Sequence, residues 1–189
     1  LCLREKGETG TAMLSFRLSA KMTPDARRRV QALRREAEIA LAAGLPFKAM
    51  TAARIAIATK PTGRDAFAID RILAEAHQQL GLDERALEIL EGLAGRIDKV
   101  FGDESPDPDL AAELLDDIGE LRYRRGESED AVILFRALRE NPALARRAGY
   151  MLALCYHRQE RHAEAIRLLD DLLLAAAEAA TRVITDAAR

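Results

Sequence analysis

The sequence predicts an all-α fold, a solenoid of antiparallel helix pairs, and three observations carry this prediction. Alanine and leucine abound, whereas aromatic residues make up 4% and tryptophan is absent, which is typical of helices packed through small aliphatic side chains. Only 11 glycines and 6 prolines interrupt the 189 residues. Apolar stretches also recur at intervals of 34 to 45 residues, the length of a helical repeat.

The register of the repeat is set by the expected turns between paired helices. These turns fall at intervals of 37, 37, 45 and 34 residues, at Gly7, Gly44, Gly81, Gly126 and Glu160. Five residues after each turn stands an alanine: Ala12, Ala49, Ala86, Ala131 and Ala165. Four residues further on, the residue is always apolar: Phe16, Ala53, Leu90, Phe135 and Leu169. Seven residues before the last four turns, the residue is always small: Ala37, Ala74, Gly119 and Ala153. Such positions suit the close approach of two helices.

The helices follow in order from these turns and from the prolines between pairs. Thr23 and Asn141 each offer a capping side chain before a proline, and Pro61 and Pro108 mark the other junctions. A polar loop, FGDESPDPDL at 101 to 110, accounts for the 45-residue interval. We therefore expect helices at about 1–6, 8–21, 24–43, 46–60, 65–80, 83–101, 109–125, 128–140, 142–159 and 162–186.

The third and fourth copies carry the clearest motif. LLDDIGELRYRRGESEDAVILFRALRENP, at 114 to 142, combines Ile118-Gly119, Tyr123, Ala131, Phe135 and Pro142, and YMLALCYHRQERHAEAIRLL follows at 150 to 169. These segments resemble tetratricopeptide repeats (TPRs) of a bacterial type. Two departures stand out, since Asp70 replaces the tryptophan of the second copy and Glu36 replaces the leucine of the first. The resemblance covers residues 1 to 174 and implies a right-handed superhelix.

The repeats predict a single domain over 1–189. A partial repeat at 1–23 precedes full repeats at about 24–61, 62–106, 107–141 and 142–174, and a C-terminal capping helix occupies 175–189. The first pair lacks most of its opening helix and the sequence begins with Leu1. We therefore expect a fragment of a longer polypeptide, whose compartment, cytoplasmic or periplasmic, stays open.

Charge and hydropathy exclude two classes of partner. Lysine plus arginine (29) nearly balances aspartate plus glutamate (31), for a net charge of -2, so no basic field favours nucleic acid. The longest apolar runs, such as LLLAAA at 172 to 177, fall far short of the roughly 20 residues of a membrane-spanning helix. We expect neither a nucleic-acid partner nor a membrane segment in this chain.

The stretch CYHRQERHAEAI, at 155 to 166, is the strongest candidate for a metal site. Its ligands would be Cys155, His157 and His162, with Glu160 nearby. No two of these three share a helical face at i,i+4 spacing, and no zinc motif is present. In the repeat register, Cys155 and Cys2 each stand five residues before a turn, so both are expected to pack as small hydrophobes. We predict no metal site and no cofactor.

Two other chemistries are weaker still. The carboxylates Asp103, Glu104, Asp107 and Asp109 are interrupted by two prolines and lack the alternation of a calcium loop. The serines have no recognisable nucleophile constellation, and no glycine-rich phosphate loop exists. We expect no enzymatic activity.

The resemblance implies that the first helix of each pair lines a concave groove that binds partners. In the third and fourth copies the expected groove residues are Asp116, Glu120, Tyr123, Tyr150, Leu154, His157 and Arg158. In the first two copies, Arg34, Glu38, Arg71, Glu75 and Gln78 are expected there, and the arginines and glutamates can form i,i+4 pairs.

The sequence thus predicts a non-catalytic scaffold that binds a protein or peptide segment in this groove. Two alternatives stay open: a regulatory or sensor module that controls an attached effector, and a structural spacer in an envelope or exopolysaccharide-export assembly. Exposed repeat ends also leave a homo-oligomer open.

Overall fold

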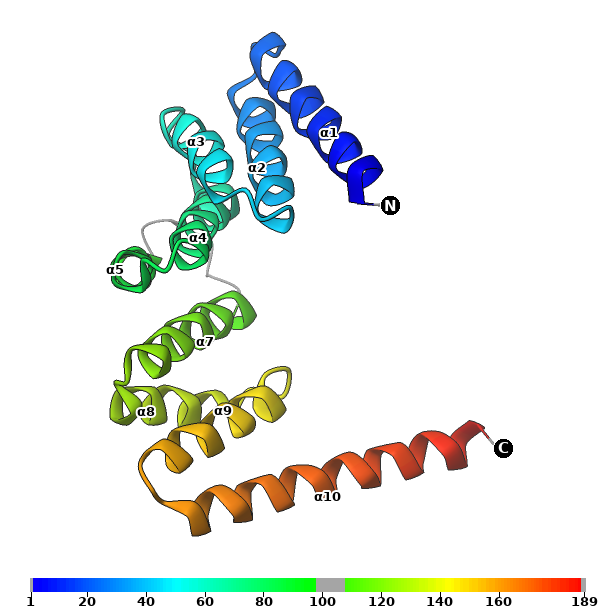
Figure 1. Cartoon of the computed structure of the whole chain (residues 1–189), viewed down its shortest axis with the longest axis vertical. Helices are drawn as coiled ribbons and strands as arrows, with labels where there is room; N and C mark the ends of the chain where they lie inside the picture. Colours follow the sequence, from blue (N-terminus) through cyan, green and yellow to red (C-terminus); the bar gives the residue numbers. More distant parts are fainter. Residues whose placement is uncertain (1, 98–107, 188–189) are drawn as a thin grey trace. The chain divides into compact units, whose positions relative to one another are not determined.

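The computed structural model describes the backbone of residues 2–97 and 108–187 and the side chains of residues 8–97 and 108–180. In these ranges the chain forms nine α-helices and no strand, which confirms the predicted all-α class (Figure 1). Consecutive helices pack against each other within two compact units, Leu1–Pro106 and Asp107–Arg189. No helix among the described residues is long and apolar enough to cross a membrane.

The first unit contains five of the helices. They are α1 (Cys2–Met22), α2 (Ala26–Ala42), α3 (Pro46–Ile57), α4 (Gly63–Gln79) and α5 (Asp83–Ala94). Alanines without exposed surface, among them Ala37, Ala40, Ala49 and Ala53, fill much of its core. Because alanine has a small side chain, these helices approach each other closely.

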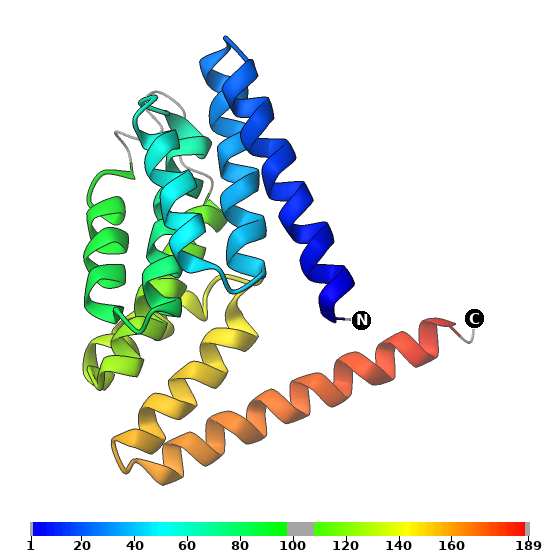
Figure 2. The ribbon, with the colours of Figure 1, turned by 45° about the horizontal axis from the view of Figure 1, so that its top comes forward.

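The second unit contains the other four helices. They are α7 (Pro108–Arg125), α8 (Ser128–Leu138), α9 (Ala145–Arg158) and α10 (His162–Ala187). Phe135, Leu152 and Cys155 lie in its core with 2% exposure or less. Figure 2 shows that α10 continues well past the start of its antiparallel neighbour α9.

The predicted turn at Gly7 is wrong. Helix α1 runs without a break from Cys2 to Met22, through both Gly7 and Gly10 (Figures 1 and 2). A glycine inside a helix costs only about 1 kcal/mol relative to alanine, and no proline follows Gly7 before Pro24 to end the helix. The expected pair of helices at 1–6 and 8–21 is therefore one helix.

The other four turns are confirmed and share one geometry. Gly44, Gly81, Gly126 and Glu160 all have positive φ angles of 67°, 71°, 90° and 60°. In each turn the N–H of the following residue donates to the carbonyl five residues earlier, as from Leu45 to Ala40 and from Arg161 to Tyr156. This Schellman arrangement requires a left-handed residue, which glycine adopts without steric cost and Glu160 does not.

Several helix ends differ from expectation for local reasons. Helix α3 ends at Ile57 because Lys60 is left-handed and Pro61 has no N–H. Helix α5 ends at Ala94, and residues 95 and 96 form a turn, so the helix expected to 101 ends early; residues 98–101 lie outside the described residues, as does most of the loop at 101 to 110. Helix α2 is capped by Asp25 rather than Thr23, since Asp25 Oδ1 accepts from Arg27 N at 2.8 Å.

Two acidic residues that depart from the repeat motif are each paired with an arginine. Glu36 is 4% exposed; its Oε2 accepts a hydrogen bond from Arg17 Nε of α1 at 3.1 Å, and its Oε1 forms an ion pair with Arg17 Nη2 at 2.6 Å. Asp70 accepts from Arg96 at 2.7 Å, and burial raises the pKa of its carboxyl against the opposing effect of Arg96. These arginines explain how carboxylates occupy positions where the motif has large apolar residues.

Candidate functional site

The seven predicted groove residues of the second unit lie on two neighbouring helices. Asp116, Glu120 and Tyr123 belong to α7, and the other four belong to α9, which contacts α7 directly. We call this set the α7–α9 surface; its members are Asp116, Glu120, Tyr123, Tyr150, Leu154, His157 and Arg158. The repeat register thus placed them on the first helices of two successive pairs.

The acidic residues of the α7–α9 surface are held by Arg147 of α9. Its Nε lies 2.5 Å from Asp116 Oδ2 and its Nη2 lies 2.6 Å from Glu120 Oε2. The hydrogen bond to Asp116 is the main cause that raises the pKa of the Arg147 guanidinium. Asp116 is 5% exposed, and its Oδ1 has no hydrogen-bond partner among the described residues. The buried carboxylate of Asp116 therefore fixes the position of Arg147, while Glu120 stays accessible to a partner.

The aromatic member from α7, Tyr123, is covered on one face by Arg158. The guanidinium carbon of Arg158 lies 4.0 Å from the centroid of the Tyr123 ring, a cation–π distance. Arg158 Nη1 also donates to the carbonyl oxygen of Tyr123. These contacts hold the end of α7 and the end of α9 together, because each residue lies in the last turn of its helix.

Tyr150 is the exposed aromatic member of the α7–α9 surface. Its side chain is 52% exposed, and no hydrogen bond to its hydroxyl is found among the described residues. Leu154 is half-buried and lies one helical turn further along, on the same face. This pair offers an aromatic and an aliphatic group beside the ion pairs of Arg147.

The candidate metal ligands do not form a coordination site. Cys155 has no exposed surface, and burial raises the pKa of its thiol to about 11, so it packs as predicted. The rings of His157 and His162 lie on either side of the turn, with centroids 5.2 Å apart. Within the described part of the chain, no group of three potential metal ligands is found. The side chain of Cys2 lies outside the described residues.

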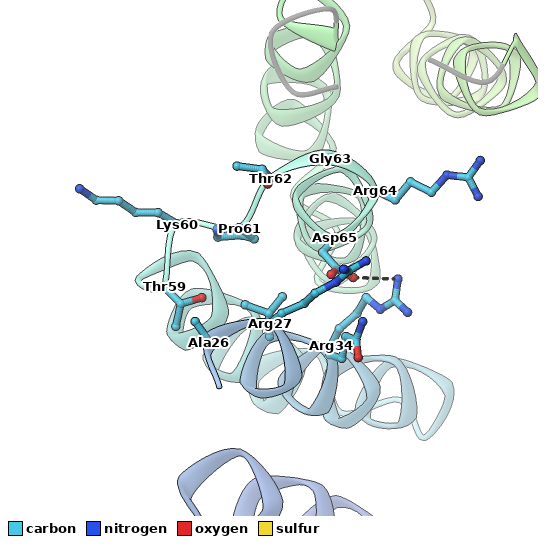
Figure 3. A pocket seen from close by; sticks show the side chains of 12 residues that line it. Ala26, Arg27, Arg34, Thr59, Lys60, Pro61, Thr62, Gly63, Arg64 and Asp65 are labelled. Carbon is cyan, nitrogen blue, oxygen red and sulfur yellow. Dashed lines mark ion pairs between the residues drawn. The ribbon is translucent and has the colours of Figure 1, made fainter. Parts of the chain in front are cut away.

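A second candidate site lies in the first unit, where α2 begins beside the turn from α3 to α4. It is a pocket of about 720 Å³, shown in Figure 3. Its lining residues are Ala26, Arg27, Val30, Gln31, Arg34, Thr59, Lys60, Pro61, Thr62, Gly63, Arg64 and Asp65. We call it the basic pocket, because four of these residues are cationic and one is anionic.

The cations of the basic pocket differ in what they contact. Arg34 is held loosely, at 3.4 Å from Asp65 and 3.6 Å from Glu38, so the predicted i,i+4 pair of Arg34 and Glu38 is confirmed. Arg27 extends from α2 over the pocket, whereas Lys60 and Arg64 extend outward on either side of it (Figure 3). Arg27 and Lys60 make no ion pair within the described residues.

Comparisons with known proteins bear on the fold. No protein-family model and no curated protein matches the chain. Solved structures do match. MamA is 18% identical with a TM-score of 0.72, and the match covers 94% of each chain. A Podosopora anserina kinesin light chain with nearly identical TPR-like repeats is 18% identical with a TM-score of 0.72, over 93% of this chain and 90% of that one.

A third match is the Rap protein in complex with Competence and Sporulation Factor. It is 17% identical with a TM-score of 0.68, and the match covers 92% of this chain and 51% of the Rap chain. These similarities extend over nearly all of the chain. They indicate the same repeat fold as the four turns of one geometry described above.

The chain has a TPR-type fold.

In this TPR-type fold, sequence reasoning missed two groups of residues that the structure places at the candidate sites. Arg147 was not predicted, although it stands three residues before Tyr150 and therefore on the same helical face. Arg27 stands seven residues, two helical turns, before Arg34, so periodicity indicates it as well. No local signal indicates Lys60 or Arg64, because the turn after α3 brings them to α2 only in the folded TPR pair.

Proposed function

We propose that this chain is a non-catalytic scaffold that binds a protein or peptide segment through the first helices of its TPR pairs. The observation that carries the proposal is the exposure of Tyr150 beside Leu154 on the α7–α9 surface. A half-exposed tyrosine with an apolar neighbour and ordered charges around it is the composition of a binding hot spot.

The surrounding ion pairs support this role. Because Arg147 is fixed by Asp116 and Glu120, and Arg158 lies on Tyr123, the surface is ordered before any partner arrives. A preorganised surface loses less side-chain entropy on binding. In the proposal Asp116 positions Arg147, while Glu120, Tyr123, Tyr150, Leu154, His157 and Arg158 contact the partner.

The comparisons add a precedent for the class of partner. The Rap structure of the same fold holds a second component, the Competence and Sporulation Factor. Solenoids present extended surfaces that suit segments of other chains. A protein or peptide partner is therefore the proposal that fits both the fold and the α7–α9 surface.

The proposal is tested by capturing partners with the 189-residue chain and measuring dissociation constants for a captured protein. We expect Tyr150→Ala and Leu154→Ala to weaken binding about tenfold or more, as truncation of a hot spot does, and Glu120→Lys to weaken it through reversed charge. Ile133→Ala is the control, because Ile133 is 67% exposed on α8, outside the surface. Unchanged affinity in all three variants, with native melting curves, would contradict the proposal.

A further inference from the structure

The basic pocket is a second feature on first helices, independent of the α7–α9 surface. Its walls come from the starts of α2 and α4, which contact each other directly, and from the turn before α4. Its volume of about 720 Å³ falls in the range of roughly 300 to 1,000 Å³ that is usual for ligand sites. It is large enough for one or two residues of a peptide.

The charges of the basic pocket are unbalanced. Arg27 and Arg34 extend from α2 beside it, and the one carboxylate of its lining, Asp65, is already engaged by Arg34 at 3.4 Å. Arg27 and Lys60 make no ion pair within the described residues, and Arg27 extends from α2 over the pocket (Figure 3). Like charges gathered around one cavity raise the local concentration of an anion.

Two other pockets show that this imbalance is not a general property of the surface. The pocket beside Tyr156 is lined by three arginines and three carboxylates, so its charges cancel. The pocket at the start of α8 is lined by three carboxylates and one arginine, Arg158. The excess of positive charge therefore distinguishes the basic pocket from both.

The polar groups around the cations suit an oxygen-rich anion. A guanidinium offers paired N–H donors to a carboxylate or phosphate, and Arg27 and Arg34 lie on one face of α2, two turns apart. Thr62, the N-cap residue before α4, makes no side-chain hydrogen bond to the helix. Val30, which is 3% exposed, supplies an apolar wall for the carbon chain that carries the anion.

We propose that the basic pocket binds a carboxylate or phosphate group on a peptide segment, with Arg27 as the principal contact and Arg34 beside it. This inference rests on the proposed function only in taking the ligand to be a peptide. It assigns an acidic or phosphorylated residue to the segment that this unit recognises.

The test is a titration of the 189-residue chain with defined peptides, followed by backbone amide NMR signals and calorimetry. The probes are capped hexaglutamate, a capped hexapeptide of alanines with one central phosphoserine, and capped hexaglutamine as the neutral control. We expect an anionic peptide to shift the signals of residues 26–34 and 59–65, hexaglutamine to leave them unchanged, and added salt to weaken binding through screening. The tighter of the two anionic peptides identifies the source of the anion.

Matched variants separate the pocket from net charge. Arg27→Gln is expected to weaken binding about tenfold, because it removes a charge-assisted contact. Arg28→Gln removes the same charge from the next position of α2, where Arg28 does not line the pocket, and is expected to change affinity less than about twofold, as an exposed charge does. Equal weakening by both variants would overturn the proposal, as would unshifted signals with both anionic peptides at millimolar concentration.

The two proposals fail separately. The peptide titrations change no residue of the α7–α9 surface. A captured partner whose affinity does not depend on Tyr150 therefore contradicts the scaffold proposal and leaves the result of the titrations unchanged. The converse outcome is that captured partners depend on Tyr150 while neither anionic peptide binds in the titrations. In that case the scaffold proposal stands and the proposal of an acidic ligand in the basic pocket fails.

Discussion

A β-carbon on Gly119 of α7 would lie 2.9 Å from Cζ of Phe135 on α8. The ring of Phe135 has no exposed surface, so it has little room to move. The register predicted a small residue at 119 and a large apolar residue at 135, and the structure shows the two in direct opposition. Glycine is required here by close packing and not by backbone conformation, since Gly119 lies inside a helix.

We expect Gly119→Ala to destabilise the chain by about 1 kcal/mol. Overpacking costs about 1–3 kcal/mol, which exceeds the helix propensity of roughly 1 kcal/mol that alanine gains over glycine. In a Phe135→Leu background the same substitution should become neutral or stabilising, because the ring atoms are gone. Urea unfolding of the four proteins measures this coupling. Gly149→Ala is the control, since its β-carbon would face the flexible end of Leu172 at 3.1 Å and should not destabilise.

The buried carboxylate of Glu36 makes a second prediction. Arg17→Met should destabilise by about 2 kcal/mol, because it leaves Glu36 buried without its partner. The double variant Arg17→Met with Glu36→Leu, which restores the leucine of the repeat motif, should recover stability to within about 1 kcal/mol of the parent. Chemical unfolding tests both. A double variant no more stable than the Arg17→Met single variant would show that the ion pair is not what permits glutamate at this position.

Glu160 is strained at φ 60°, in a turn where the three sister positions are glycine. Glu160→Gly should stabilise the chain by about 0.5–1 kcal/mol, because glycine adopts the left-handed conformation without the cost of a β-carbon. Gly126→Ala, at the equivalent position with φ 90°, should destabilise by about 1 kcal/mol. Thermal melting measures both shifts. A destabilised Glu160→Gly would mean that the glutamate side chain contributes more than its backbone costs.

The buried thiol of Cys155 should be unreactive in the folded chain. Burial raises its pKa from 9.0 to about 11, with a smaller opposing effect of Arg158, and only the thiolate is nucleophilic. In a Cys2→Ser variant at pH 8, we expect reaction with a disulfide reagent to be at least about 100-fold slower in the native state than in denaturant. Comparable rates would contradict the burial of this side chain.

The same shift makes stability depend on pH. Because folding raises the pKa of this thiol, its contribution is fully present below pH 9 and is lost as the pH rises from 9 to about 11. The free energy of unfolding should therefore fall more steeply over this range for the parent chain than for Cys155→Ala. Parallel curves for the two proteins would rule out the linkage.

The local sequence pattern predicted most of the fold because the same spacing of turns, small residues and apolar residues recurs in several repeats. Four turns place a left-handed residue at the predicted position, and the small residues Ala37, Ala74, Gly119 and Ala153 are all buried. It was wrong at Gly7, where a turn was assigned from one glycine without a proline after it. It also placed Leu169 at a helix contact, whereas Leu169 is 37% exposed and Leu168 is buried, because no helix follows α10 among the described residues.

For the candidate sites, the sequence by itself determined which helical faces carry them. Helical periodicity puts Tyr150 and Leu154 on one side of α9, and Arg34 on the corresponding side of α2. Only the tertiary structure decided which charges are already paired. Arg147 meets Asp116 across 31 residues of sequence, and the turn before α4 brings Asp65 within 3.4 Å of Arg34. Periodicity fixes the direction of a side chain about its own helix, but a charge finds its partner only when two helices are packed together.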